Sequence, residues 1–444
     1  MKDTVSVLTL GCRVNQYESD SMCARLRSAG VRIVPFGNPA DVAVVNTCTV
    51  TAESDRKSRQ MIRRAAQNAT HVVVTGCFAQ VDPDAAAASE GVVYVCGNEG
   101  KASLADTVLA ILGGAIPETP AQVDPPVGRH GVEMTLTAPM RTRSYIKIED
   151  GCNNRCSYCL IRTARGPVRS KDPALVLEEA ASLAKAGAKE VILTGIEAAS
   201  YGMDFEDRKP YGHALAELIR GVQEIDGIER IGLGSLEPTV MNDVFCEAAR
   251  DCPKLLPHFH LSVQSGSDPV LAAMRRRYRA ETVLTAIRRM KDARPDATFS
   301  ADVIVGFPGE SEEQYEETEA FCRAARFLHL HIFPYSKREG TEAAAMENQV
   351  PEAVKHERAA RLEAVGAGIR RELLADYVDL HRDTPVMLLV EKCVGGMCSG
   401  HSEHFVELKR ISGKAGIGEI VPVLVDATDG VICTGHFAHE PLKG

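Results

Sequence analysis

The first 115 residues alternate short apolar runs with stretches that have the period of an amphipathic helix. The apolar runs have the length and the valine and isoleucine content of buried strands, and they lie at residues 5–10, 32–35, 41–47, 71–76 and 92–95. Helical stretches separate or follow them at residues 17–29, 53–66 and 101–112. This alternation predicts a parallel sheet with helices on both faces. We therefore expect an α/β domain over residues 1–115.

A proline-rich segment follows this domain. The prolines at positions 117, 120, 125, 126 and 139 can neither continue a helix nor occupy a central strand. We therefore expect a linker over residues 116–140.

The alternation then resumes on a larger scale. Further strands are expected at residues 144–149, 190–196, 230–236, 258–264, 298–306 and 329–336. The helices between them are expected at residues 174–186, 213–225, 239–251, 268–276, 282–293 and 312–325. Six strand–helix units are two short of an eightfold barrel, so an open, partial (β/α)6 barrel is the expected closure.

The last part of the chain changes period again. Strong helix formers follow Pro351 and predict a helix over residues 351–375. Apolar and polar residues then alternate with period two between glycine-rich turns. We expect the barrel domain to span residues 141–370 and a small, five-stranded all-β barrel to span residues 371–440.

Composition narrows the class of protein. Hydrophobic residues at 45% and charged residues at 25% are typical of a globular chain and exclude a disordered or collagen-like one. We expect no membrane span and a cytoplasmic protein, because no apolar run approaches the ~18 residues that a span needs and the N-terminus has no leader pattern. The net charge of −9 means that any nucleic-acid partner must bind a local basic patch.

Fourteen cysteines make metal or redox chemistry the better expectation, because structural disulfides are rare in the cytosol. Cys152, Cys156 and Cys159 form a C-x-x-x-C-x-x-C loop directly after the first barrel strand. Three thiolates in one loop leave one iron of a [4Fe–4S] cube with an open position. The alternatives are three unrelated thiols, or a zinc site completed by a distant histidine.

A second group of cysteines lies in the first domain. Cys12, Cys48 and Cys77 each follow a predicted strand, so all three face the same edge of a parallel sheet. Cys96 follows a fourth strand, and spacing does not exclude it as a further ligand. The remaining cysteines are interpreted as packing residues, at positions 23, 246, 252, 322, 393, 398 and 433.

The cysteine loop at the end of the first barrel strand resembles that of the radical S-adenosylmethionine enzymes. The segments TLGCRVNQYESD, NTCTVTAESDRKSRQMIRRA, VTGCFAQ, GLGSLEP, HLSVQSGSD and DVIVGFPGES together look like the methylthiotransferases over essentially the whole chain. This resemblance implies a flavodoxin-like N-terminal domain, a radical S-adenosylmethionine barrel and a C-terminal TRAM barrel. It implies S-adenosylmethionine and two [4Fe–4S] clusters, one on the barrel cysteines and one on Cys12, Cys48 and Cys77, without Cys96.

The same resemblance suggests contacts to S-adenosylmethionine. Tyr158 would contact the adenine, although packing beside the cluster is an equally good interpretation. Arg276 would pair with the cofactor carboxylate, and Gly306 and Gly309 are turn glycines that also let a ligand approach the backbone. The other candidates end the second, third and fourth barrel strands and are Thr194, Gly195, Glu197, Ser235, Glu237 and Gln264. Glu197 departs from the uncharged or imidazole residue expected there.

The expected partner is the anticodon loop of transfer RNA, because the resemblance is to the branch that methylthiolates threonylcarbamoyladenosine at position 37. An electron donor and a sulfur source must come from outside the chain. Basic residues that flank the two cysteine groups are candidate RNA contacts: Arg56, Lys57, Arg59, Arg63, Arg64, Arg162, Arg165, Arg169 and Lys171. The TRAM barrel would hold the stem.

Other functions stay open at this point. A methylthiotransferase could act instead on isopentenyladenosine 37 or on a ribosomal-protein aspartate. A non-catalytic alternative is an electron-transfer or RNA-binding iron–sulfur protein, which predicts four cysteines for each cluster.

Overall fold

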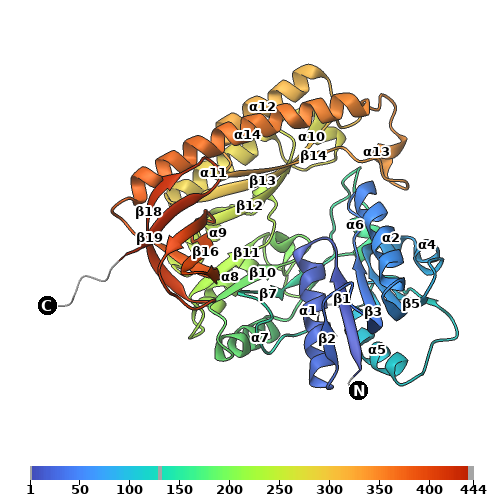
Figure 1. Cartoon of the computed structure of the whole chain (residues 1–444). Helices are drawn as coiled ribbons and strands as arrows, with labels where there is room; N and C mark the ends of the chain where they lie inside the picture. Colours follow the sequence, from blue (N-terminus) through green and yellow to red (C-terminus); the bar gives the residue numbers. More distant parts are fainter. Residues whose placement is uncertain (1–2, 129–132, 439–444) are drawn as a thin grey trace.

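The structure is a computed structural model that describes residues 3–128 and 133–438. Figure 1 shows three parts: an N-terminal domain in blue, a central barrel in green and yellow, and a C-terminal β-barrel in red on the far side of the central one. None of the described helices is long and apolar enough to cross a membrane.

The N-terminal domain is a parallel six-stranded sheet in the order β2-β1-β3-β4-β5-β6. Its strands are β1 (Thr4–Thr9), β2 (Arg32–Val34), β3 (Ala40–Thr47), β4 (Ala69–Gly76), β5 (Val92–Cys96) and β6 (Ala121–Gln122). The order of the first five confirms the flavodoxin-like expectation. The sixth comes from the segment expected to be a linker, and it pairs with β5 through Val95 and Cys96.

Helices cover both faces of this sheet. They are α1 (Arg13–Ser28), α2 (Ala52–Ala66), α3 (Cys77–Val81), α4 (Pro83–Ala87), the 3-10 turn η1 (Glu99–Ser103) and α5 (Leu104–Leu112). Met22, Leu26 and Val108 pack on one face with Val42 and Val44. The opposite side chains of the same strands pack against α2, α3 and α4, which is why β3 and β4 are apolar throughout.

The central domain is an open barrel of two parallel three-stranded sheets. One sheet holds β7 (Arg143–Lys147), β10 (Glu190–Thr194) and β11 (Arg230–Leu233), and the other holds β12 (His258–Gln264), β13 (Thr298–Val305) and β14 (His329–Pro334). Single bridges, Ile231 to Leu255 and Leu236 to Leu261, join β11 to the second sheet. No ladder joins β7 to β14 among the described residues, so the barrel is open along that side.

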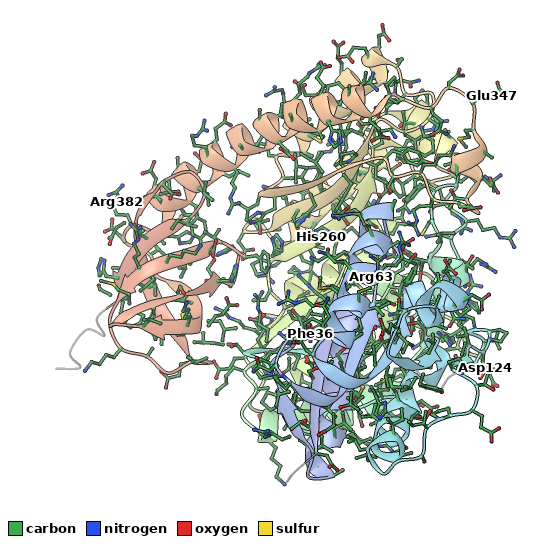
Figure 2. The ribbon with its side chains drawn as sticks, turned by 45° about the vertical axis from the view of Figure 1, so that its right-hand side comes forward. Phe36, Arg63, Asp124, His260, Glu347 and Arg382 are labelled. Atoms are coloured by element: carbon green, nitrogen blue, oxygen red, sulfur yellow. A yellow bond between two sulfur atoms is a disulfide. The ribbon has the colours of Figure 1, made fainter. Side chains whose placement is uncertain are left out.

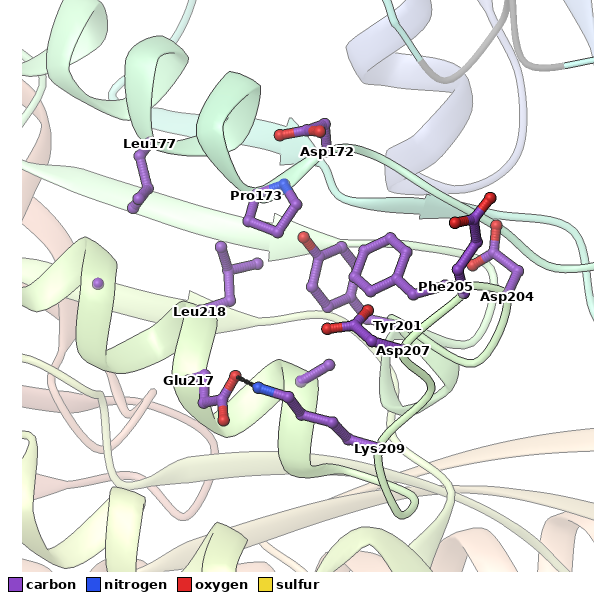
Figure 3. Close-up of a pocket in the computed structure, with 13 residues that line it drawn as sticks. Asp172, Pro173, Leu177, Tyr201, Asp204, Phe205, Asp207, Lys209, Glu217 and Leu218 are labelled. Carbon is purple, nitrogen blue, oxygen red and sulfur yellow. Dashed lines mark hydrogen bonds and ion pairs between the residues drawn. The ribbon is translucent and has the colours of Figure 1, made fainter.

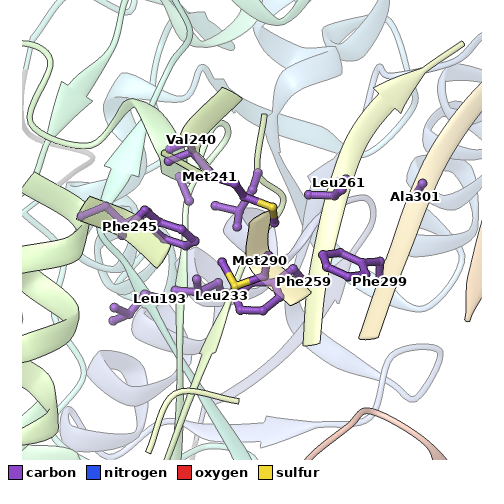
Figure 4. Close-up of a cluster of buried hydrophobic side chains, with 14 of the residues drawn as sticks. Leu193, Leu233, Val240, Met241, Phe245, Phe259, Leu261, Met290, Phe299 and Ala301 are labelled. Carbon is purple, nitrogen blue, oxygen red and sulfur yellow. The ribbon is translucent and has the colours of Figure 1, made fainter. Parts of the chain in front are cut away.

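Helices surround the barrel and complete its core. They are α7 (Pro173–Lys185), α8 (His213–Gln223), α9 (Asp243–Asp251), α10 (Asp268–Ala273), α11 (Ala280–Ala293) and α12 (Glu312–Ala325), with the short elements α6 (Ile161–Arg165), η2 (Ala198–Ser200), η3 (Pro238–Val240) and α13 (Glu342–Ala345). Phe245, Phe259 and Met290 lie in one continuous apolar cluster with the strand side chains (Figure 4). The helix expected from residue 239 begins at Asp243 instead, because Asn242 caps it with its side chain.

A long helix, α14 (Glu352–His381), leads into the C-terminal barrel. The boundary expected at residue 371 falls inside this helix, which continues ten residues beyond it. The barrel is closed in the order β15-β16-β17-β19-β18, formed by β15 (Val386–Val394), β16 (Met397–Ser402), β17 (Glu407–Ser412), β18 (Ile420–Thr428) and β19 (Cys433–Phe437). The interpretation of Cys393 and Cys398 as separate packing thiols is wrong, because they form a disulfide across the β15–β16 hairpin.

A buried group of charges joins the N-terminal domain to the barrel. Glu18 of α1 contacts Lys101 and lies 2.9 Å from both Lys147 and Arg165. Asp150, in the short strand β8 (Glu149–Asp150), lies 2.9 Å from Arg165 and 3.2 Å from Lys147. Burial alone would raise the pKa of Asp150, but Arg165 and Lys147 hold it below its ordinary value. Three cations thus surround two carboxylates with no access to water.

This network corrects part of the RNA expectation. Arg165, Arg169 and Lys171 are buried, and each pairs with a carboxylate of the protein: Arg169 with Glu99 at 2.7 Å and Lys171 with Glu179. They were candidates because they follow the cysteine loop, but a buried, ion-paired cation is not available to a phosphate. The exposed candidates include Lys57, Arg162 and Arg63, the last of which is labelled in Figure 2.

Replacing Arg165 with methionine should lower the free energy of unfolding by about 3–5 kcal/mol, because the change leaves the buried carboxylates of Glu18 and Asp150 undercompensated. Denaturant titration of the purified protein measures the change. Arg162→Met, on the same short helix but exposed, is the matched control and should cost less than about 0.5 kcal/mol. A loss below about 1 kcal/mol for Arg165→Met would contradict the role of the network.

Glycine precedes three of the candidate cysteines, and each of these glycines has a positive φ: 92° at Gly11, 101° at Gly76 and 84° at Gly151. A Cβ atom on Gly76 would lie 2.6 Å from the backbone nitrogen of Thr47. Gly76→Ala should therefore cost about 2–5 kcal/mol, from left-handed strain and overpacking together. Gly30, with φ of 88° and no atom within 4 Å of its Cβ position, is the matched control. Its alanine variant should cost only about 1–2 kcal/mol in the same titration, and equal losses would rule out the packing argument.

Candidate functional site

The barrel cysteine loop is held in a fixed shape by its own backbone. The amide of Cys152 donates to the carbonyl of Gly166 at 3.1 Å, and the amide of Cys159 donates to the carbonyl of Cys156 at 3.1 Å. Ser157 ties the loop to α10 through a hydroxyl bond to the carbonyl of Ala273 at 2.8 Å. A side chain at Gly151 would lie 2.6 Å from the carbonyl carbon of Pro167. The loop therefore turns sharply out of the barrel and presents three thiols that form no disulfide.

Arg276 lies against this loop. Its Nη1 is 3.3 Å from Cys156 Sγ, and its Nη2 donates to the carbonyl of Ser262 at 3.0 Å and lies 3.7 Å from Glu237. Glu237 also accepts a hydrogen bond from Asn154 of the loop at 3.0 Å. The structure thus brings Arg276 and Glu237, two of the expected cofactor contacts, to the cysteine loop.

Three carboxylates form a chain beside the same loop. Glu149 accepts a hydrogen bond from the backbone of Glu197, and Glu197 accepts one from the backbone of Glu237, both at 2.9 Å. Burial and the neighbouring Glu237 raise the pKa of Glu197 to about 8. Glu149 Oε1 is buried with no hydrogen-bond partner among the described residues. Uncompensated buried carboxylates of this kind favour the binding of a cationic group.

Glu149 was not foreseen from the sequence. Its signal was present, because it ends the expected strand 144–149 immediately before the cysteine motif. Arg13 was also not predicted as a site residue, because the recognisable feature at this position is the neighbouring Cys12.

The second group of cysteines gathers at one edge of the N-terminal sheet, as predicted. Cys12 is the N-cap of α1, Cys48 follows β3, and Cys77 begins α3. A Cβ atom on Gly11 would be 2.9 Å from Cys48 Sγ. Only glycine therefore allows the backbone before Cys12 to lie this close to Cys48. Burial raises the pKa of Cys48 to about 11, and the nearby thiols of Cys77 and Cys12 act in the same direction.

Cys96 does not join this group. Its thiol donates to Thr75 Oγ1 at 3.3 Å, and it packs in the apolar cluster with Val73 and Leu104. Its environment is that of an ordinary core cysteine.

The two cysteine groups face each other across the domain boundary. Cys77 is near enough to Cys159 to contribute to the raised pKa of that thiol. Asn98 spans the boundary, because its Nδ2 lies 3.7 Å from Cys77 Sγ and donates to the carbonyl of Ala164 at 2.7 Å. Arg165 of the buried charge network is the cation nearest this edge, and both Cys77 and Cys12 act on its pKa.

A cavity of about 320 Å³ is lined by residues of the barrel strands and, from the first domain, by Cys12 and Arg13. It brings together Cys12 from the first domain and Thr194, Gly195 and Ser235 from the barrel strand ends. Phe405 of the C-terminal barrel closes its far end, stacked on His258 with ring centroids 4.7 Å apart. The size is that of a ligand pocket.

Three further residues expected to contact the cofactor, Tyr158, Gln264 and Gly306, do not line this cavity. Tyr158 packs edge-on against Phe307, with centroids 6.5 Å apart, which is the packing alternative. Gln264 ends β12 with φ of 74°, a conformation that costs a non-glycine residue energy and that is concentrated at functional sites. Gly306 is a turn glycine, since its amide bonds to Glu310 and a side chain there would contact Lys355.

A larger cavity, of about 670 Å³, lies outside the barrel between α7 and α8 (Figure 3). Tyr201 and Phe205 form its apolar side, and Asp172, Asp207 and Glu217 surround it. None of the expected cysteines or cofactor contacts lines it, so size alone does not identify the site.

The donor sets fit iron–sulfur cubes better than a single ion. Among residues 3–128 and 133–438, no three histidine, cysteine, aspartate or glutamate side chains are close enough to hold one metal ion. A zinc ion needs such a set, whereas a cube takes each thiolate on a different iron and so spaces the thiolates more widely. The excess of cations beneath the two groups suits the negative charge of a thiolate-ligated cluster.

Comparisons with known proteins agree with this geometry. Residues 146–322 match the Radical SAM superfamily, and residues 4–97 match the uncharacterized protein family UPF0004. Among solved structures, the radical S-adenosylmethionine methyltransferase TsrM from Kitasatospora setae is similar, with a TM-score of 0.57 and 15% identity over 78% of this chain and 74% of that one. At that identity the likeness shows the fold alone.

Full-length relatives carry the assignment further. The chain is 38% identical to the threonylcarbamoyladenosine tRNA methylthiotransferase MtaB of Bacillus subtilis, over 95% of this chain and 93% of the relative. It is 36% identical to the protein of that name from Thermotoga maritima, over 97% and 96%. It is 37% identical to tRNA-2-methylthio-N(6)-dimethylallyladenosine synthase of Streptomyces coelicolor, over 82% and 72%. The chain belongs to the methylthiotransferase family of radical S-adenosylmethionine enzymes.

Proposed function

We propose that this enzyme converts N6-threonylcarbamoyladenosine at position 37 of transfer RNA into its 2-methylthio derivative. The observation that carries the proposal is the pair of three-cysteine groups, one from each domain, which Asn98 links across the domain boundary, with Cys12 also lining a ligand-sized cavity. The two relatives that match nearly end to end are named for this substrate.

Each cysteine group would hold one [4Fe–4S] cluster. Cys152, Cys156 and Cys159 would ligate the cluster that binds S-adenosylmethionine, and Cys12, Cys48 and Cys77 would ligate the second. With both groups loaded and an external electron donor present, the first would supply the radical chemistry that removes hydrogen from C2 of the adenosine, and the second would supply the inserted sulfur, with the methyl group coming from a second S-adenosylmethionine. Each site offers three candidate cysteine ligands, and Cys96 packs in the core of the first domain. This arrangement supports a radical enzyme over an electron-transfer protein that ligates each cluster with four cysteines.

The chain's own residues would position S-adenosylmethionine. Glu149 and Glu197 would accept hydrogen bonds from its amino group, which satisfies the partnerless oxygen of Glu149. Thr194, Gly195 and Ser235 line the cavity where the rest of the molecule would extend. Arg276, already bound to Glu237 and Cys156, would fix the cysteine loop and face the cofactor carboxylate.

Transfer RNA would approach from the side where the barrel is open. Lys57 and Arg162 are exposed on the helices that follow Cys48 and Cys159, and Arg63 is exposed further along α2; these cations would contact the phosphates of the anticodon loop. A loop base can reach the cavity only when it is unstacked and swung out. The enzyme would act in the cytoplasm, with an external electron donor and sulfur source.

Separate cysteine variants should split the reaction into its two parts. Cys152→Ala should abolish formation of 5′-deoxyadenosine on reduction with dithionite, because the first cluster loses a ligand. Cys48→Ala should keep that activity but form no methylthio product on transfer RNA bearing threonylcarbamoyladenosine. Liquid chromatography with mass detection measures both, after anaerobic reconstitution.

Cys246→Ala, which alters a core thiol on α9, is the control and should keep both activities. Retention of 5′-deoxyadenosine formation in Cys152→Ala, or of methylthio product in Cys48→Ala, would overturn the ligand assignments. Product on dimethylallyladenosine 37 and none on threonylcarbamoyladenosine 37 would favour the other branch, whose Streptomyces coelicolor relative is 37% identical.

Binding of S-adenosylmethionine should strengthen as the pH rises from about 6 to about 7.5. The pKa of Glu197 is about 8, so the fraction ionised, and able to bind an ammonium group, increases about tenfold per pH unit over this range. Glu197→Gln should bind more weakly at pH 7.5 and lose this slope. Equilibrium dialysis of the reconstituted protein measures it, and an unchanged slope in the variant would exclude Glu197 as the group.

A further inference from the structure

Arg13 enters the cavity without an ionic partner. It is the first residue of α1, directly after Cys12, and both side chains line the cavity. Its Nη1 lies 3.4 Å from the carbonyl oxygen of Leu233. This distance is longer than that of an ordinary N–H···O hydrogen bond, so the contact is weak. Among the described residues, no carboxylate lies within ion-pair distance of its guanidinium.

The carboxylates that share the cavity are already engaged. Glu190 lies 3.5 Å from Arg230, and Asp302 Oδ2 lies 3.1 Å from His260 Nε2. A partly buried guanidinium with no ion pair among the described residues gains most from an anion that enters the cavity.

Polar and apolar side chains share the walls around Arg13, and Ile192, Leu233 and Leu256 are among the apolar ones. His260 Nδ1 lies 2.8 Å from Ser300 Oγ, and its ring meets that of His331 edge-on at 5.3 Å (Figure 2 labels His260 within the barrel). Ser235 and Ser300 add hydroxyl groups. Burial lowers the pKa of His331, which leaves it a neutral hydrogen-bonding group. A substituent that carries hydroxyl and carboxylate groups would find several hydrogen-bonding partners here.

We propose that Arg13 is the specificity-determining residue of this enzyme and binds the carboxylate of the threonylcarbamoyl group on the substrate adenosine. The inference rests on the proposed function and names the part of the substrate that the cavity recognises. Arginine presents two parallel N–H groups that match a carboxylate. A dimethylallyl group has no acceptor and would leave the same guanidinium desolvated and unpaired, which is how a polar site rejects an analogue.

The carboxylate of S-adenosylmethionine is a second possible anion, and the experiment separates the two. Reconstituted holoenzyme is given anticodon stem-loops that carry threonylcarbamoyladenosine, its methyl ester, or dimethylallyladenosine at position 37. The dissociation constant of each stem-loop, the kcat/KM for methylthiolation, and the dissociation constant of S-adenosylmethionine are measured for the wild type, Arg13→Gln and Arg13→Lys. Arg25→Gln, an exposed ion-paired arginine on the same helix, is the matched control.

The wild type should bind and use the acid about 10- to 100-fold better than the ester. Arg13→Gln should lose about that factor on the acid and little on the ester, so that the ratio approaches one, while S-adenosylmethionine binding is unchanged. Arg13→Lys should keep an intermediate ratio, because it keeps the charge without the fork. Arg25→Gln should behave as wild type.

The wild-type results test the function, and the variants test Arg13. Wild-type activity on the acid together with an unchanged acid-to-ester ratio in Arg13→Gln overturns the inference alone. Equal losses on acid and ester, or weaker binding of S-adenosylmethionine, also overturn it and assign Arg13 to the cofactor or the cluster. A wild type that modifies only the dimethylallyl stem-loop overturns both. The cluster absorbance of each variant shows whether it is folded. If Arg13→Gln is not folded, the acid-to-ester ratio of Arg13→Lys decides the outcome.

Discussion

The buried ion pairs between α1, η1 and the first barrel strands are the constraint on which the site depends. Glu18 and Asp150 are held by Lys101, Lys147 and Arg165 at the contact between the two domains. Burying such charges is costly unless every partner is in place, so the domains can meet in only one orientation without a large penalty. That orientation sets the distance between the two cysteine groups, which lie on different domains.

Local backbone geometry also fixes the positions of the candidate cysteine thiols. Cys12, Cys77 and Cys152 each follow a glycine with positive φ, and at Gly76 and Gly151 the backbone of a neighbouring segment occupies the space of a side chain. Each strand therefore ends in a sharp turn that delivers a thiol to the sheet edge. The same turns fix the backbone at this edge in the absence of any bound group. Binding a group to these thiols therefore requires little further ordering of the backbone.

The cavity combines elements from all three parts of the chain. Arg13 comes from the first domain, the histidines and serines come from the barrel strands, and Phe405 closes the far end from the C-terminal barrel. Arg143 lies over the ring of Phe405 at 5.5 Å and 2.8 Å from Glu391, so the C-terminal barrel is docked on the side of the cavity opposite the cysteines.

The sequence by itself determined the elements and the two cysteine groups, because strand and helix periods and the position of a residue after a strand are local properties. It predicted β12 at residues 258–264 and the placement of Cys12, Cys48 and Cys77 at one edge. Only the tertiary structure decided which polar side chains are buried. Arg165, Arg169 and Lys171 look like an RNA-binding run, yet their partners lie on distant segments that spacing does not reveal. Glu149 and Arg13 stand beside the cysteine motifs in the sequence, but the unpartnered oxygen of one and the cavity around the other are set by segments that folding brings together. The Cys393–Cys398 disulfide depends on the register of the β15–β16 hairpin, which places these two residues opposite each other.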